Sequence, residues 1–235
     1  MRYYFFWTLC SITMLMTVSS CSSDDREFKA LDDALDRIDA ITTQKENELA
    51  SVRQMLNSAA DGNERYALNN KLYDEYMSFI YDSAAYYVER NMELSQKMGD
   101  GHRVALSKMK KVNVMSVNGL FPEATELLNS VDTTVLTKQE MLEYYDLHGN
   151  LDLHKAEYYD DTPYRVAYIQ STIAYRKKII ASADKNSFIY NVALATNLAE
   201  EVKTREAIEV LEGYLNRSQL KSGSRYYSIV TNILA

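Results

Sequence analysis

Apolar residues recur with strict 3-4 spacing from about Glu27 to Asn57. The positions are 28, 31, 35, 38, 42, 45, 49, 52 and 56, and most are apolar: Phe28, Leu31, Leu35, Ile38, Leu49, Val52 and Leu56. This spacing predicts one long amphipathic helix over residues 27–58. Such a narrow stripe suits a coiled-coil partner or one neighbouring helix. Two interpretations follow: a homodimer through the helix Glu27 to Asn57, or packing within the chain.

The rest of the chain divides into helix pairs separated by turn residues, the first being Asp61-Gly62-Asn63. Pro122 and Pro163 are its only prolines, and no alternating run of β-branched residues is long enough for a strand. The pattern therefore predicts an all-α fold. We expect helices at about residues 64–77 and 81–98, 103–117 and 122–129, 138–156 and 164–183, 187–200 and 205–216, and finally 224–235.

Small residues mark a repeat in these pairs. Alanines at 84, 124, 167 and 207, separated by 40, 43 and 40 residues, each fall early in the second helix of a pair. An alanine there lets two helices approach closely, and a large apolar residue one turn later fills the groove. This resembles the tetratricopeptide repeat (TPR), although with a longer period. We expect a helical-hairpin solenoid with a period of about 40 over residues 63–235, truncated in its last repeat.

The first residues have a different character. Residues 3–18 are almost wholly apolar, and Arg2 is the only charge in residues 1–20, which is typical of a secretory signal peptide. Val18-Ser19-Ser20-Cys21 resembles the bacterial lipobox, which implies a lipid on Cys21 and a short polar tether over residues 21–26. Two alternatives remain, an uncleaved membrane anchor and an ordinary signal followed by a coincidental cysteine.

Charge narrows the class of partner. The chain has a formal net charge of −7, which becomes −8 when Arg2 leaves with the leader. An acidic surface repels phosphate backbones, so we expect no direct nucleic acid binding by this segment.

The sequence contains few residues that could form a catalytic, cofactor-binding or metal site. His148 and His154 lie six residues apart, which turns them about 240° from each other on one helix, so they cannot share a metal. No nucleophile motif or glycine-rich phosphate loop occurs. We expect no catalytic, cofactor-binding or metal site, and therefore a binding protein rather than an enzyme.

Tyrosine is the conspicuous residue, with 19 in the chain. Its apolar ring and polar tip suit both a repeat core and a recognition surface. We expect most of the tyrosines in the core. Tyr158 and Tyr159, in the long loop between the predicted helices at 138–156 and 164–183, are the candidates for contact with a protein or peptide partner.

Several motifs together resemble one family. In order, they are Leu35-Asp36, Gln44-Lys45-Glu46, Glu64-Arg65-Tyr66, Leu72-Tyr73-Asp74-Glu75-Tyr76 and Asp82-Ser83-Ala84-Ala85-Tyr86-Tyr87. The chain is similar in these to a Bacteroidota family of extracytoplasmic TPR-like regulators, in which a transmembrane helix, a coiled coil and a helix-turn-helix domain follow the repeats. Because the last repeat breaks off at Ala235, the resemblance implies only the N-terminal sensor part.

These observations lead to one functional hypothesis and one alternative. We expect a lipid-anchored module of the cell envelope, outside the cytoplasm and facing the periplasm or the cell surface, that senses a partner for a transcriptional regulator. The alternative is a stand-alone lipoprotein that acts as a scaffold in an envelope complex.

Overall fold

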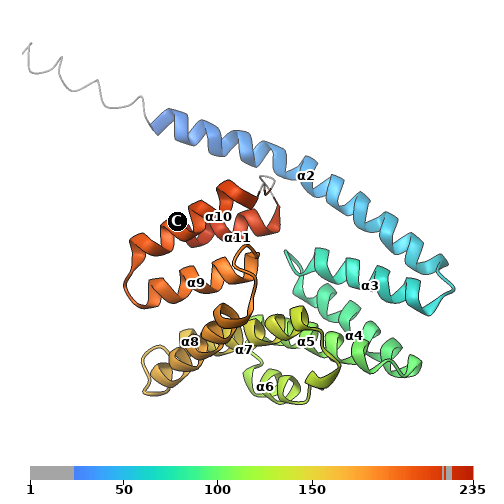
Figure 1. Cartoon of the computed structure of the whole chain (residues 1–235). Coiled ribbons are helices and arrows are strands. Elements are labelled where there is room, and N and C mark those ends of the chain that lie inside the picture. Colours follow the sequence, from blue (N-terminus) through green and yellow to red (C-terminus); the bar gives the residue numbers. More distant parts are fainter. Residues whose placement is uncertain (1–23, 219, 221–223, 235) are drawn as a thin grey trace, which may run out of the picture. The chain divides into compact units, whose positions relative to one another are not determined.

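The computed structural model describes residues 24–218, 220 and 224–234 (Figure 1). All regular secondary structure in these residues is helical, which confirms the predicted all-α class. The predicted signal peptide over residues 1–20 and the lipid site Cys21 lie outside the described residues. The chain divides into two compact units, and the boundary lies between Asn57 and Ser58.

The first unit is dominated by one long helix. Helix α2 (Asp24–Ser58) begins three residues before the predicted Glu27 and so includes the end of the predicted tether. It corresponds to the segment with 3-4 apolar spacing.

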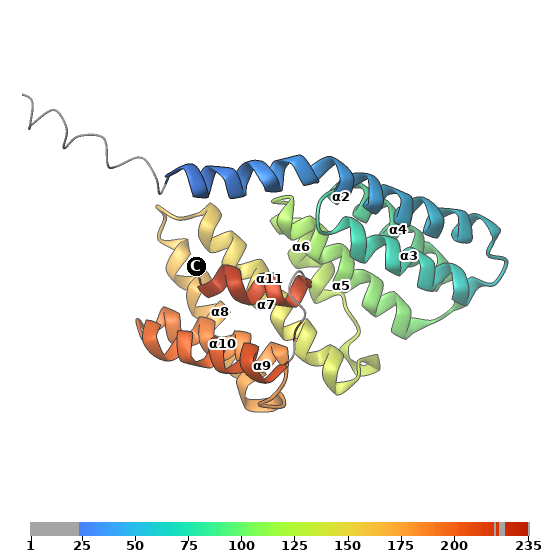
Figure 2. The same ribbon diagram turned by 90° about the horizontal axis from the view of Figure 1, so that it is seen from above.

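The second unit is a chain of helix pairs. They are α3 (Gly62–Tyr76) with α4 (Tyr81–Met98), α5 (Gly101–Val117) with α6 (Phe121–Asn129), α7 (Lys138–Tyr158) with α8 (Tyr164–Ser182), and α9 (Phe188–Glu200) with α10 (Thr204–Ser218), followed by α11 (Arg225–Leu234). Each helix packs against the next along the chain, and α5 also packs against α7, as expected for a solenoid (Figure 2). A short 3₁₀ helix, η1 (Thr133–Val135), was not predicted.

Polar side chains cap the N-terminus of the first helix in several of the pairs. The Asp61 carboxylate accepts a hydrogen bond from Glu64 N at 3.1 Å, and that of Asp100 accepts one from Arg103 N at 3.0 Å. Thr137 forms a reciprocal capping box with Glu140, because each side chain accepts a hydrogen bond from the other residue's backbone N–H. These caps satisfy N–H groups that have no partner inside a helix, so they fix where the pairs start.

The apolar core is distributed along the solenoid. One cluster joins the second pair to α7 through Ala105, Met109, Val112, Phe121, Ala124, Leu128, Val131 and Leu151. A second cluster joins α9, α10 and α11 through Ala195, Ala207, Leu211, Tyr214 and Val230. Each pair therefore buries its apolar face against its neighbours.

The predicted alanine repeat is right in three pairs and wrong in one. Ala84 and Ala124 are fully buried and Ala207 is nearly so, whereas Ala167 is exposed. The buried stripe of α8 runs through Thr172, Arg176 and Ile179, and Ala167 does not lie on it. The close approach in this pair occurs at Gly149, where an added methyl group would meet Tyr175 Cβ at 3.7 Å and the carbonyl oxygen of Thr172 at 3.8 Å.

Within the described part of the chain, none of the helices combines the length and the apolar character needed to cross a membrane.

Candidate partner-binding surface

Exposed aromatic side chains gather where α7 turns into α8. Tyr158 ends α7 and is 72% exposed, and Tyr164 begins α8 and is 67% exposed. Val166, in the first turn of α8, is also exposed. Such large apolar groups in solvent are unusual when they occur together, and they mark interaction surfaces.

The rings at this turn contact one another. Tyr158 meets Phe121 edge-on with centroids 5.6 Å apart and also meets Tyr159 edge-on at 5.0 Å. Tyr159 in turn stacks on Tyr168 at 6.0 Å and lies 6.4 Å from Tyr164. We call Tyr158, Tyr159, Tyr164 and Tyr168 the aromatic patch. Because its rings support one another, a partner would meet them in a largely preformed arrangement.

The loop that joins the two helices of the patch is held by its own hydrogen bonds. The Thr162 hydroxyl donates to the carbonyl oxygen of Tyr159 at 2.8 Å, and its backbone N–H donates to the same oxygen at 3.0 Å. Arg165 Nε lies 2.6 Å from Asp160 Oδ1. The patch therefore has acidic and basic groups at its edge, as partner-binding surfaces usually do.

A second aromatic group lies in the same pair of helices. His148 stacks on Tyr175 with centroids 4.5 Å apart and meets Tyr144 edge-on at 4.6 Å. Lys178 Nζ lies 4.5 Å from the centroid of the Tyr175 ring, a cation–π contact. Burial lowers the pKa of His148 to about 4, so its imidazole is neutral at pH 7.

Arg176 on α8 is a buried cation that lies close to carboxylates of α7 and α9. Arg176 is only 9% exposed, and its Nη1 lies 3.7 Å from Glu200 Oε1. Burial raises the pKa of Asp146 to about 6, although attraction to Arg176 and a 3.0 Å hydrogen bond from Asn150 oppose the rise. The positive charge of Arg176 therefore attracts two carboxylates from neighbouring helices, Glu200 on α9 and Asp146 on α7.

Asp146 and His148 make opposite contributions to the pH dependence of stability. The pKa of Asp146 is raised from 3.8 to about 6, so its contribution is present below pH 4 and is lost as the pH rises through 6. The pKa of His148 is lowered from 6.5 to about 4, so its contribution is present above pH 6.5 and is lost as the pH falls through 4. In the unmodified chain the two changes partly cancel.

Single substitutions are expected to reveal each contribution. As the pH rises from 4 to 6.5, the free energy of unfolding of Asp146→Asn should rise by about 2 kcal/mol relative to that of the unmodified chain. That of His148→Gln should fall by less than about 2 kcal/mol, because solvent screens the partly exposed imidazole. Urea unfolding followed by circular dichroism at a series of pH values measures both. Differences that stay constant with pH would contradict these assignments.

The remaining histidines have structural partners. His102 Nε2 lies 2.9 Å from Glu140 Oε2, and His154 Nδ1 lies 2.7 Å from the Ser116 hydroxyl. Across the residues described, no three His, Cys, Asp or Glu side chains gather closely enough to hold a metal ion.

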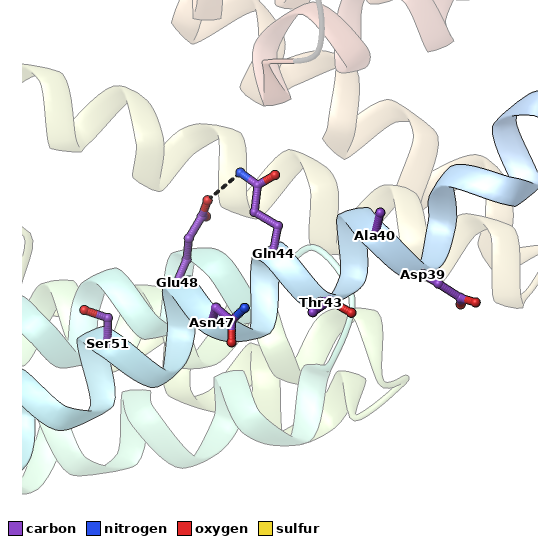
Figure 3. A pocket seen from close by; sticks show the side chains of 7 residues that line it. All are labelled: Asp39, Ala40, Thr43, Gln44, Asn47, Glu48 and Ser51. Atoms are coloured by element: carbon purple, nitrogen blue, oxygen red, sulfur yellow. Dashed lines mark hydrogen bonds between the residues drawn. The ribbon is translucent and has the colours of Figure 1, made fainter.

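A shallow hollow also lies along α2 (Figure 3). Its lining residues all come from this one helix: Asp39, Ala40, Thr43, Gln44, Asn47, Glu48 and Ser51. The Gln44 amide donates to Glu48 Oε1 at 3.0 Å, so these two polar groups satisfy each other. The side of a single helix cannot enclose a small molecule, so the hollow is not a ligand pocket.

The structure places two further tyrosines beside the two that the sequence singled out. Tyr158 and Tyr159 lie together, but Tyr158 is far the more exposed. Sequence reasoning missed Tyr164 and Tyr168. The signal that could have found them is the short spacing across Pro163, which lets the start of α8 fold back beside the end of α7.

The model of one protein family, the SusR N-terminal TPR domain, matches residues 35–235. The chain belongs to this family. No curated protein matches it. The matched region of this SusR-type TPR domain includes all the helix pairs and the whole aromatic patch. The predicted resemblance to the sensor part of the Bacteroidota regulators is thereby confirmed.

Proposed function

We propose that this SusR-type TPR domain is the sensor part of a transcriptional regulator, held outside the cytoplasm by a lipid on Cys21. We further propose that it binds a protein or peptide partner through the aromatic patch. The family match supports a helical-repeat binding module. The apolar leader and the sequence Val18-Ser19-Ser20-Cys21 support export and lipid attachment.

The exposure of Tyr158 and Tyr164 is the observation that carries the binding role. Tyrosines contribute a large share of binding energy in protein interfaces, because they bury much apolar area and keep a hydroxyl for hydrogen bonding. The neighbouring Asp160 and Arg165 give the rim polar character. A peptide or protein segment with apolar side chains fits this surface.

Site-specific photo-crosslinking in the native host tests the proposal. With benzoylphenylalanine in place of Tyr158, we expect one discrete adduct, identified by mass spectrometry. Adding Tyr164→Ala should lower its yield at least about fivefold, because a neighbouring contact residue is lost. Adding Cys21→Ala should move the chain out of the membrane fraction and lower the adduct yield as well.

Tyr226 supplies the matched control, because it is 53% exposed and lies outside the patch. Tyr226→Ala should leave the adduct unchanged. If the crosslinker at Tyr226 captures the same partner as efficiently as the crosslinker at Tyr158, the patch is not the binding surface. Transcripts that do not change when the chain is deleted would favour the lipoprotein scaffold instead.

A further inference from the structure

The N-terminal half of α2 carries an apolar stripe that is exposed to solvent. Its members are spaced by three, four, three and three residues. They are Phe28, Leu31, Leu35, Ile38 and Ile41, with exposed fractions of 63, 53, 52, 50 and 63%. We call these five residues the α2 stripe. Farther along the same helix, Leu49 and Val52 are buried. A helix with so continuous an exposed stripe is built to pack against another helix.

The charges beside the stripe are acidic. With Phe28 and Leu35 at heptad positions a, the flanking positions e are Asp32 and Asp39, both exposed. Ile41 occupies a flanking position g. Lys29 and Arg37 are the only basic residues between positions 28 and 41, and they fall at the outer positions b and c, away from the stripe. Arg37 is moreover engaged on its own helix, where its Nε donates to the carbonyl oxygen of Asp33 at 2.9 Å.

This pattern argues against a second copy of the chain as the occupant. In an antiparallel pair the e positions of two copies face each other, so Asp32 and Asp39 would meet aspartates. In a parallel pair they would face position g, where this half of the helix offers no cation. Like charges or unpaired charges at these positions weaken association and select another partner.

We propose that the α2 stripe docks an amphipathic helix of a different protein, with apolar residues on one face and Lys or Arg beside them. Residues 28–41 span about 20 Å of helix, so the partner segment needs about four turns. Its basic residues would pair with Asp32 and Asp39 while its apolar face covers Leu31, Leu35 and Ile38. The α2 stripe and the aromatic patch share no residue, and the inference does not depend on the function proposed for that patch.

A pair of designed peptides tests this inference on the full chain in phosphatidylcholine nanodiscs. Both peptides are helices of about 21 residues with leucine at a and d, and they carry either lysine or glutamate at e and g. Fluorescence anisotropy, corrected with empty nanodiscs, should show the lysine peptide binding at least about tenfold more tightly than the glutamate peptide. Higher salt should reduce this preference. Leu35→Asp should abolish binding of the lysine peptide.

Charge exchange separates specific docking from general attraction. Asp32→Lys with Asp39→Lys should reverse the preference in favour of the glutamate peptide. Asp33→Lys with Asp36→Lys changes the charge of the helix equally but at outer positions, and it should leave the lysine peptide preferred. If both double variants behave alike, the proposed docking geometry is wrong.

Two other occupants give distinct results that would overturn the proposal. If the chain binds neither peptide and sediments as a dimer that Leu35→Asp converts to a monomer, the stripe pairs with a second copy of the chain. If the chain binds neither peptide, stays monomeric and loses thermal stability on Leu35→Asp, its own residues cover the stripe.

Discussion

Replacing Arg176 by methionine is expected to lower the free energy of unfolding by about 3 kcal/mol at pH 7. Arg176 is almost fully buried and faces Glu200 on α9, while its charge also stabilises the partly buried Asp146 on α7. Methionine fills a similar volume but leaves both carboxylates without their cation. The loss should shrink as the pH falls toward 5, because Asp146 is then protonated. Chemical denaturation at pH 7 and pH 5 measures both effects.

Arg165→Met is the matched control for this prediction. Arg165 lies on the same helix and pairs with Asp160, but both side chains are about half exposed or more, so its loss should cost less than about 1 kcal/mol. Adding Asp146→Asn to Arg176→Met should restore part of the stability. Equal losses for the two arginine variants would show that Arg176 does not stabilise the carboxylates of Asp146 and Glu200.

Enlarging Ala124 to leucine is expected to destabilise the domain by about 2 kcal/mol. Ala124 has no exposed surface and lies in the cluster that joins α5, α6 and α7. Three additional heavy atoms can be accommodated only if α6 moves away from its neighbours, because protein interiors are closely packed. A lower midpoint of urea unfolding with an unchanged denaturant dependence is the expected result.

The chain contains its own control at the equivalent position of the next pair. Ala167 is likewise the fourth residue of its helix but is exposed, so Ala167→Leu should change stability by no more than about 0.5 kcal/mol. A large loss at Ala167 together with a small loss at Ala124 would reverse the assignment of which alanine lies at a helix contact.

The candidate site was only partly predictable. Tyr158 and Tyr159 could be singled out because they stand together in a long predicted loop. Their ring contacts with Phe121 and Tyr168 join residues of α6, α7 and α8 that lie far apart in the sequence. Such contacts depend on the crossing of the helices, which no local pattern specifies. The burial of Arg176 was missed for the same reason, since an arginine in a polar stretch normally faces solvent.

The all-α class and the positions of the helix pairs could be predicted from the sequence alone. They arise from local periodicity, from capping residues such as Thr137, and from turn residues such as Gly99 with its left-handed backbone. The family could be recognised from the order of its motifs. Which positions are buried depends on the tertiary structure. It moved the close helix contact in the third pair from Ala167 to Gly149 and Thr172, because the buried stripe of α8 follows the packing of three helices rather than the repeat period. Burial of that kind is a property of neighbours that the sequence pattern of one helix does not contain.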